Sequence, residues 1–291
     1  MKCYDCPVRC GADREKGVGA CKAPEEFKIA HADLHFWEEP CISGKRGTGA
    51  VFFSGCNLNC VFCQNFKISG TGSGKVVSEE ELTDIIFALV ERGAQTVSFV
   101  TPSHYITPLA EFLAVLKPKL NGIPIVYNSG GYDSVEGLKK LDGLVDVYLP
   151  DYKYGDSELA KKYGARADYP SVAFAAVKEM ISQQPNTVFD EDGVIRKGVI
   201  VRHLVLPGCI ENTKLALDVI RDFGRDVYVS LMAQYFPVNK PIEFDNLRRR
   251  LTQEEYDQAI DYFFDIGLKN GFSQELTAAD EGFVPDFNFF K

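Results

Sequence analysis

Short apolar segments alternate with amphipathic segments along most of this 291-residue chain, and this alternation constrains the fold more than any other feature. Strands are predicted for six segments rich in β-branched and aromatic residues, namely residues 50–55, 96–101, 124–129, 146–151, 199–206 and 226–235. Helical stripes separate these segments, and the first stripe begins at a capping box of Ser78 and Glu81. Strands that alternate with crossover helices form parallel sheets. We therefore predict an α/β fold, a partial (β/α)6 TIM-like barrel open on one side.

The two ends of the chain differ from this pattern. Residues 1–45 are rich in cysteine and interrupted by glycine, so they are predicted to form a metal-bound loop segment. Residues 46–270 would form the barrel, and the Phe-rich residues 271–291 a tail packed on it.

Composition excludes some classes of partner. The chain has 32 Lys and Arg against 41 Asp and Glu, a formal net charge of −9, which argues against a nucleic acid or an anionic membrane surface as its main partner. The sequence has no signal-peptide core and no window long and apolar enough to span a membrane, so we expect a cytoplasmic protein.

Three cysteines follow the first predicted strand in the segment SGCNLNCVFCQN. Cys56, Cys60 and Cys63 have the spacing C-x3-C-x2-C, short enough for one loop to surround a cluster. Thiolates are soft ligands suited to iron and sulfur, and nine cysteines in a reducing compartment favour metal ligation over disulfides. Three protein ligands would leave one iron of a [4Fe-4S] cluster open. The alternative is a zinc loop with a fourth ligand from elsewhere.

At these residues the chain resembles the radical S-adenosylmethionine superfamily, whose motif has this spacing and an aromatic residue before the third cysteine, here Phe62. More closely, it resembles pyruvate formate-lyase activating enzyme-like proteins in the segments CYDCPVRCGADR, ISGKRGTGAVFFSGCNLNCVFCQN, FVTPSHY, VYNSGGY, VYLPDYKY, RHLVLPG and SLMAQYFP. The resemblance implies reductive cleavage of S-adenosylmethionine to methionine and a 5′-deoxyadenosyl radical, with an electron donor such as flavodoxin or ferredoxin. In activating enzymes that radical takes a hydrogen atom from a glycine of a partner glycyl radical enzyme.

The resemblance also suggests residues that contact the cofactor at the ends of later strands. Asp151 and Lys153 match the family's Asp-x-Lys motif, which contacts the cofactor and a nearby monovalent cation; the alternative is a surface ion pair. Asn128 and Ser129 correspond to a small polar stretch at the amino-acid or ribose end, although Asn-Ser-Gly-Gly is also ordinary turn chemistry. Arg202 is expected to bind a carboxylate through its planar fork, or else to be a buried structural arginine.

One segment departs from the family pattern. Many radical S-adenosylmethionine enzymes have Gly-Gly-Glu after the second strand, where this chain has FVTPSHY. Thr101, Ser103 and His104 are candidates to replace it as hydrogen-bonding groups, with a structural role for His104 equally expected. After the sixth strand, Gln234 and Tyr235 are expected to line the substrate side.

A second group of thiols, with spacing C-x2-C-x3-C-x10-C, comprises Cys3, Cys6, Cys10 and Cys21. A loop this rich in glycine needs a cross-link to stabilise its conformation, and a zinc ion or an auxiliary [4Fe-4S] cluster bound by the four thiols would supply one. Cys41 could replace one ligand or be free, and Cys209 is expected to be an unligated thiol.

The leading hypothesis for function is therefore a radical S-adenosylmethionine enzyme that activates a glycyl radical enzyme. A first alternative is radical modification of another peptide or of a small metabolite. A second, from a different class, is a non-catalytic iron-sulfur electron carrier or a zinc-stabilised scaffold.

Overall fold

The six predicted strands are all present and parallel in the computed structural model, which describes residues 2–237, 243–274, 276 and 287. They are β2 (Thr48–Phe53), β4 (Val97–Val100), β5 (Ile125–Ser129), β6 (Val147–Pro150), β8 (Ile195–Leu204) and β9 (Tyr228–Met232). Strands β2, β4, β5 and β6 are buried over their whole length, as expected of parallel strands covered on both faces.

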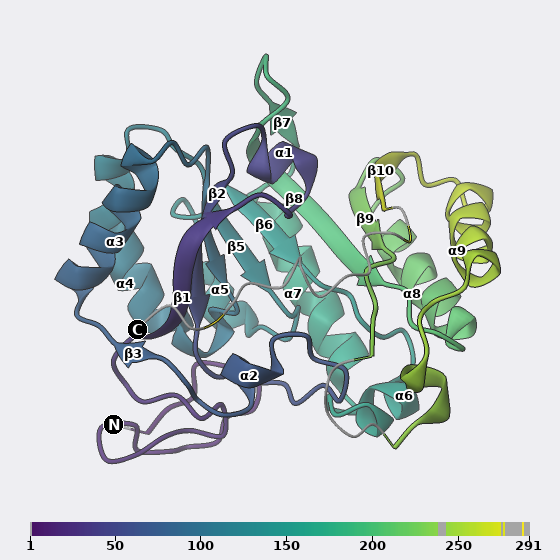
Figure 1. Cartoon of the computed structure of the whole chain (residues 1–291), viewed down its shortest axis with the longest axis horizontal. Coiled ribbons are helices and arrows are strands. Elements are labelled where there is room, and N and C mark those ends of the chain that lie inside the picture. Colours follow the sequence, from purple (N-terminus) through teal and green to yellow (C-terminus); the bar gives the residue numbers. More distant parts are fainter. Residues whose placement is uncertain (1, 238–242, 275, 277–286, 288–291) are drawn as a thin grey trace.

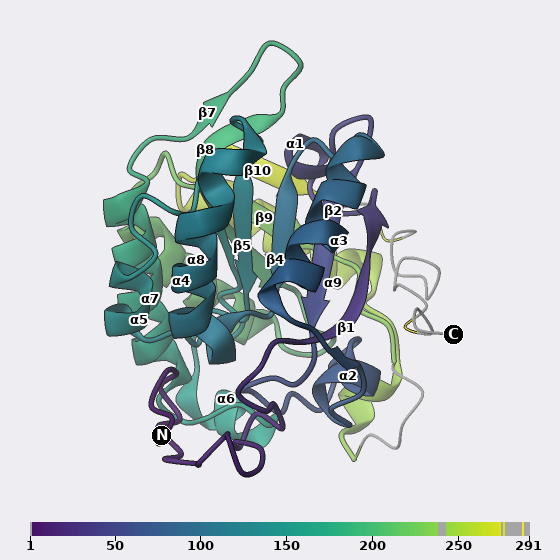
Figure 2. The same ribbon diagram turned by 90° about the vertical axis from the view of Figure 1, so that its left-hand side faces the viewer.

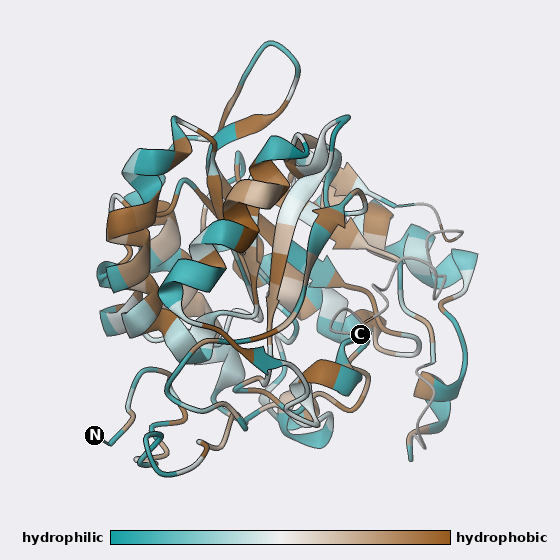
Figure 3. Ribbon diagram, turned by 60° about the vertical axis from the view of Figure 1, so that its left-hand side comes forward, coloured by the Kyte–Doolittle hydropathy of each residue, from teal (hydrophilic) through white to brown (hydrophobic). Residues whose placement is uncertain are grey.

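Helices follow these strands and cover the outer face of the sheet (Figures 1 and 2). They are α3 (Glu79–Glu91), α4 (Ile106–Leu116), α5 (Val135–Lys139), α6 (Ser157–Lys162), α7 (Tyr169–Gln183), α8 (Ile210–Asp222) and α9 (Gln253–Asp265). The predicted capping box starts α3, where the Ser78 hydroxyl accepts from the Glu81 amide at 3.1 Å and the Glu81 carboxylate accepts from the Ser78 amide at 2.9 Å. Apolar and polar residues alternate along these helices (Figure 3), which is how one face of each packs against the sheet.

The strand order is β10-β9-β8-β6-β5-β4-β2-β1-β3, with β7 (Val188–Phe189) pairing β8 off this path. Among the described residues the two ends of this order do not pair with each other, so the sheet is a partial barrel that stays open, as predicted. The structure adds a seventh parallel strand, β10 (Asn270–Ser273), beside β9. This strand contains Gly271 and is only four residues long, so it gives no clear strand pattern in the sequence.

The first part of the chain is not only a loop, which corrects the prediction for residues 1–45. Strand β1 (Lys28–His35) pairs antiparallel with β2, and the short β3 (Lys75–Val76) pairs with β1. The helix α1 (Pro40–Ser43) then leads into β2. The sheet therefore begins before the expected boundary at residue 45.

The expected tail, residues 271–291, begins inside β10. Within it, Phe287 packs edge-on against His31 of β1 and Phe52 of β2, with ring centroids 6.0 and 5.8 Å apart. Residues 277–286 and 288–291 lie outside the described part of the chain. None of the helices in the described ranges has both the length and the apolar character required to cross a membrane.

Candidate active site

The loop after β2 holds the three cysteines at the carboxyl end of the barrel strands, where (β/α) enzymes place their active sites. It begins at Gly55, whose φ of +85° is a conformation that glycine adopts without strain. Backbone bonds fix the rest: the amide of Asn59 donates to Gly164 O at 3.1 Å, and that of Val61 donates to Tyr163 O at 3.0 Å. The short helix α2 (Phe66–Ser69) closes the loop (Figure 1).

A cavity of about 810 Å³ lies inside the partial barrel, and all three cysteines line it. No other cysteine of the described residues does so. The residues that the resemblance assigns to the cofactor line the same cavity: Asn128, Ser129, Asp151, Lys153 and Arg202. The loops after β2 and β6, together with the strands β5 and β8, thus bring residues from four parts of the chain to one place.

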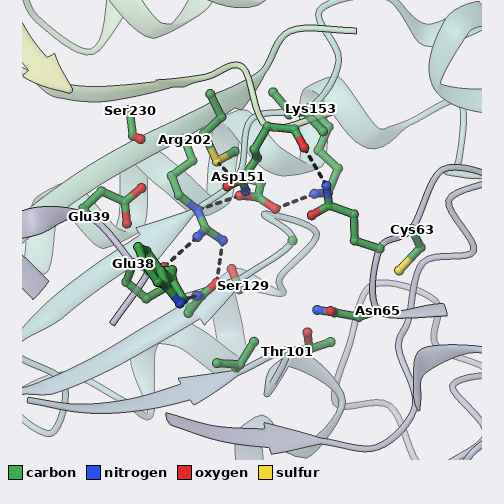
Figure 4. A pocket seen from close by; sticks show the side chains of 18 of the residues that line it. Glu38, Glu39, Cys63, Asn65, Thr101, Ser129, Asp151, Lys153, Arg202 and Ser230 are labelled. Atoms are coloured by element: carbon green, nitrogen blue, oxygen red, sulfur yellow. Dashed lines mark hydrogen bonds and ion pairs between the residues drawn. The ribbon is translucent and has the colours of Figure 1, made fainter. Parts of the chain in front are cut away.

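An ionic cluster around Arg202 forms one wall of the cavity (Figure 4). Its guanidinium donates to Asp151 at 2.8 Å, to Glu38 at 3.1 Å and to the Asn128 side chain at 2.6 Å. Lys153 pairs with the other oxygen of Asp151. The surface ion pair considered for Asp151 is wrong, because Asp151 is only 8% exposed.

Mutual attraction keeps this cluster charged despite its burial. Burial opposes ionisation of Asp151, but Arg202 and Lys153 outweigh it and lower the pKa of that carboxyl. Burial also disfavours the charged form of Lys153, but Asp151 and Cys60 outweigh it and raise the pKa of the amine. The pKa of Arg202 is raised in the same way. The cavity therefore carries fixed cations close to the thiols.

The sequence analysis missed two acidic residues of the cavity, Glu38 and Glu39, which lie between β1 and α1. Besides its bond to Arg202, Glu38 accepts from the Asn128 amide at 2.9 Å. Burial raises the pKa of Glu39 to about 7. Two adjacent acids before a proline look like an ordinary solvated turn, so the only signal in the sequence was their place after a strand-like segment.

The FVTPSHY segment, which replaces Gly-Gly-Glu, sends only one of its three candidates into the cavity. Thr101 lines the cavity with a φ of +58°, an uncommon backbone conformation for a β-branched residue. Ser103 instead hydrogen-bonds to Asp133. His104 is buried behind the loop, with Nε2 2.9 Å from Ser54 O, which corrects its expected place at the cofactor.

The remaining candidate residues divide into those that line the cavity and those that do not. Gln234 lines the cavity, while Tyr235 is fully buried in the apolar core. Cys41, a residue of α1, packs in an apolar cluster, and Cys209 contacts Tyr163 and the Asn246 amide, so neither joins a thiol group.

His203 is completely buried one residue beyond Arg202. Its Nδ1 lies 2.7 Å from Tyr152 O, so this nitrogen carries the proton, and Nε2, 3.0 Å from the Thr213 hydroxyl, accepts. Burial lowers the pKa of His203 to about 4, from the 6.5 of an exposed histidine. The imidazole is therefore neutral in the folded protein.

This neutral histidine predicts a loss of stability in acid. The unfolded chain protonates His203 below pH 6.5 and the folded chain only near pH 4. The stabilisation that comes from keeping His203 neutral is thus complete above pH 6.5. It is lost as the pH falls toward 4, which lowers the free energy of unfolding by up to about 3 kcal/mol. Urea unfolding of wild type and His203→Asn between pH 7 and 4.5 checks this, because the variant should show a flatter dependence on pH. Equal slopes in the two proteins would contradict it.

The N-terminal segment lies below α2 in the view of Figure 1. Its four thiols, Cys3, Cys6, Cys10 and Cys21, are close enough to act on one another electrostatically. An ideal Cβ at Gly19 would lie 3.2 Å from the Cys21 sulfur and 3.6 Å from that of Cys10. Burial first, and then the other three thiols of the group, raise the pKa of Cys6 to about 11. Arg14 fastens the segment, donating to His104 O at 2.6 Å and lying 3.7 Å from the Cys3 sulfur.

The two thiol groups are in direct contact through the backbone. The amide of Cys56 donates to the carbonyl of Cys21 at 3.1 Å. An ideal Cβ on Gly55 would lie 2.3 Å from that same oxygen, so only glycine fits there. The N-terminal segment is therefore part of the support of the cavity.

The donor set at Cys56, Cys60 and Cys63 fits an iron-sulfur cluster better than a single metal ion. In the described residues, no three Cys, His, Asp or Glu side chains converge as ligands of one ion. The thiolates of a cubane bind separate irons and need not converge. The Leu58 amide lies 3.4 Å from the Cys56 sulfur. Burial raises the pKa of Cys60 to about 11, and Lys153 opposes that shift by favouring the thiolate that a cluster ligand requires.

Comparison with known proteins identifies the family. The Radical SAM superfamily model matches residues 50–208, which contain the cysteine loop, Asp151, Lys153 and Arg202. The chain belongs to the Radical SAM superfamily. Membership implies a [4Fe-4S] cluster, S-adenosylmethionine and an enzyme that catalyses a radical reaction.

The chain is similar to the uncharacterized protein MJ0674 of Methanocaldococcus jannaschii, with 31% identity over 269 residues, 89% of this chain and 73% of that protein. Methylornithine synthase (PylB) has a similar structure, with a TM-score of 0.52 and 18% identity over 80% of this chain and 73% of that one. A domain of pyruvate-formate lyase-activating enzyme from Bacteroides vulgatus aligns with a TM-score of 0.46 and 14% identity, over 62% of this chain and all of that one. At these identities the solved structures indicate only the fold.

Proposed function

We propose that this radical SAM protein cleaves S-adenosylmethionine to start hydrogen abstraction from a partner substrate, most like a glycyl-radical-enzyme activating enzyme. The observation that carries the proposal is the cavity, which three cysteines from one loop share with the Arg202 cluster and with no other cysteine of the described chain. When bound, the reduced cluster supplies one electron to the sulfonium, which breaks a carbon–sulfur bond and yields methionine and the 5′-deoxyadenosyl radical.

The side chains have distinct roles in this proposal. Cys56, Cys60 and Cys63 hold the cluster and leave one iron for the amino and carboxylate groups of the cofactor. Lys153 lies beside Cys60 and faces the cofactor carboxylate. Asp151 orients Lys153 and Arg202 through its two oxygens.

The remaining polar groups of the cavity orient the cofactor. Asn128 and Ser129 end β5 at the cavity and supply hydrogen bonds to its amino-acid or ribose end. Thr101 takes the place of the family's Gly-Gly-Glu and offers a hydroxyl instead of a carboxylate.

Cys3, Cys6, Cys10 and Cys21 are proposed to hold a second metal, either zinc or an auxiliary [4Fe-4S] cluster. Their mutual electrostatic repulsion supports a bound cation, since four thiolates this close need a positive charge to ionise together. Zinc would require a small convergence of the sulfurs, because they do not surround one point.

Anaerobic reconstitution tests the central proposal. The reduced protein is expected to give an electron paramagnetic resonance signal that changes when S-adenosylmethionine is added, and then to form 5′-deoxyadenosine. Deuterium transfer from a labelled glycyl radical enzyme into 5′-deoxyadenosine would distinguish glycine activation from modification of another peptide or a metabolite. An unchanged signal and no 5′-deoxyadenosine, beside a working control enzyme, would refute the proposal.

A further inference from the structure

Glu39 is a buried carboxyl group that the proposed chemistry does not use. Its side chain lines the cavity and is only 7% exposed. Ser230 of β9 hydrogen-bonds to the carboxyl group of Glu39. The Oε2 atom of Glu39 has no hydrogen-bond partner in the described residues. Buried polar atoms nearly always have a partner, so a lone carboxylate oxygen at a cavity indicates a missing donor.

The charges of the cavity wall point to a cationic donor. The cations Arg202 and Lys153 balance the carboxylates Asp151 and Glu38, with which they form ion pairs at the cavity. Glu39 is the remaining carboxyl group of the lining; Arg202 is close enough to favour its charged form, but Glu39 makes no ion pair within the described part of the chain. His35 also lines the cavity, but burial lowers its pKa and keeps it neutral. A positive group entering beside Glu39 would complete the balance.

Glu39 and the cluster loop occupy different ends of the cavity. Figure 4 shows Glu39 beside Ser230 on one side of the Arg202 cluster, and Cys63 on the other. The amino group of S-adenosylmethionine belongs at the open iron, and therefore near Cys63. This placement leaves Glu39 for a group of a second molecule.

Apolar side chains also line the cavity on the strands around Ser230. Phe272 of β10 is the register partner of Ser230, and Met232 lies two residues further along the same face of β9. Both residues line the cavity, as does Trp37, two residues before Glu39. A ligand there would place an apolar or aromatic body against these side chains.

We propose that Glu39, with Ser230, binds the ammonium group of the substrate, which is a primary amine on an apolar body. This inference rests on the proposed function, because it assigns the second molecule in the cavity of a radical SAM enzyme. The terminal torsion angle of a glutamate has a broad distribution, so a small rotation of the carboxyl group turns Oε2 toward the ligand. The N–H group then donates to Oε2 while Ser230 keeps its bond to the carboxyl group.

Benzylamine is a suitable probe, with benzyl alcohol as its neutral counterpart. Calorimetric titration of the reconstituted protein, loaded with S-adenosylmethionine, is expected to show that benzylamine binds at least about tenfold more tightly than benzyl alcohol. Glu39→Gln should remove this preference, Glu39→Asp should retain part of it, and the exposed control Glu91→Gln should leave it unchanged. Binding is measured without turnover, so failure of the radical chemistry would not be mistaken for failure of this site.

Equal binding of the two probes to the wild type would overturn the proposal, and this comparison needs no variant. A titration of S-adenosylmethionine into Glu39→Gln identifies the source of the ammonium. If that affinity falls as much as the affinity for benzylamine, the carboxyl group serves the cofactor and the proposal is wrong. Quenching of Trp37, the single tryptophan of the chain, by benzylamine in the metal-free protein gives an independent readout.

Discussion

Cys63→Ala is expected to lower the cleavage of S-adenosylmethionine at least about a thousandfold, an increase of ~4 kcal/mol in the activation free energy. The variant leaves two thiols on a loop that must hold three corners of the cluster. A second iron then has no protein ligand, in addition to the iron that the cofactor binds. Iron content, the resonance signal of the reduced protein and 5′-deoxyadenosine formation should all fall together.

The matched control for this variant is Cys209→Ala. That thiol is buried and contacts Tyr163 and Asn246 away from the cavity. It should keep the wild-type signal and rate. If Cys63→Ala retained both as well, the open-iron site would not be at this loop.

Arg202→Ala is expected to destabilise the protein by about 3–5 kcal/mol, because it leaves two buried carboxylates, Asp151 and Glu38, without their shared cation. Chemical unfolding of the metal-free protein measures this without any contribution from the cluster. Arg202→Lys should recover only part of the loss, because one ammonium cannot replace the fork that reaches Asp151, Glu38 and Asn128 at once.

Arg249 provides the control for the stability measurement. It also makes a two-pronged bond to a carboxylate, with both distances to Glu255 at 2.7 Å, but its side chain is 45% exposed. Arg249→Ala should therefore cost less than about 1 kcal/mol. A similar loss for both arginines would show that burial adds nothing to the Arg202 cluster.

The fold was predictable where the signals are local. The six central strands are continuous apolar runs, and the capping box at Ser78 marks a helix start by itself. Strand β1 has a local signal, since His31, Asp33 and His35 alternate with apolar residues, but it was missed because the cysteine and glycine content of residues 1–45 predicts one loop for the whole segment. No short turn motif links it to its antiparallel partner β2, because α1 lies between them. Strand β10 is too short to give a pattern.

The residues of the candidate site likewise divide into those with a local signal in the sequence and those without one. Cys56, Cys60 and Cys63 could be found because their spacing lies within one loop. Glu38 could not, because its partner Arg202 is 164 residues away and nothing local links them. His104 was misplaced for a related reason: the sequence shows that it follows a strand but not that Arg14 and Ser54 hold it behind the loop.

The contact between Cys21 and Cys56 couples the N-terminal segment to the cluster loop. The carbonyl of Cys21 accepts the amide of Cys56, and Gly55 leaves no room for a side chain beside that carbonyl. A displacement of the backbone at Cys21 would therefore withdraw the acceptor from Cys56. The conformation of the first residues of the chain thus helps to set the shape of a cavity whose lining comes later in the sequence.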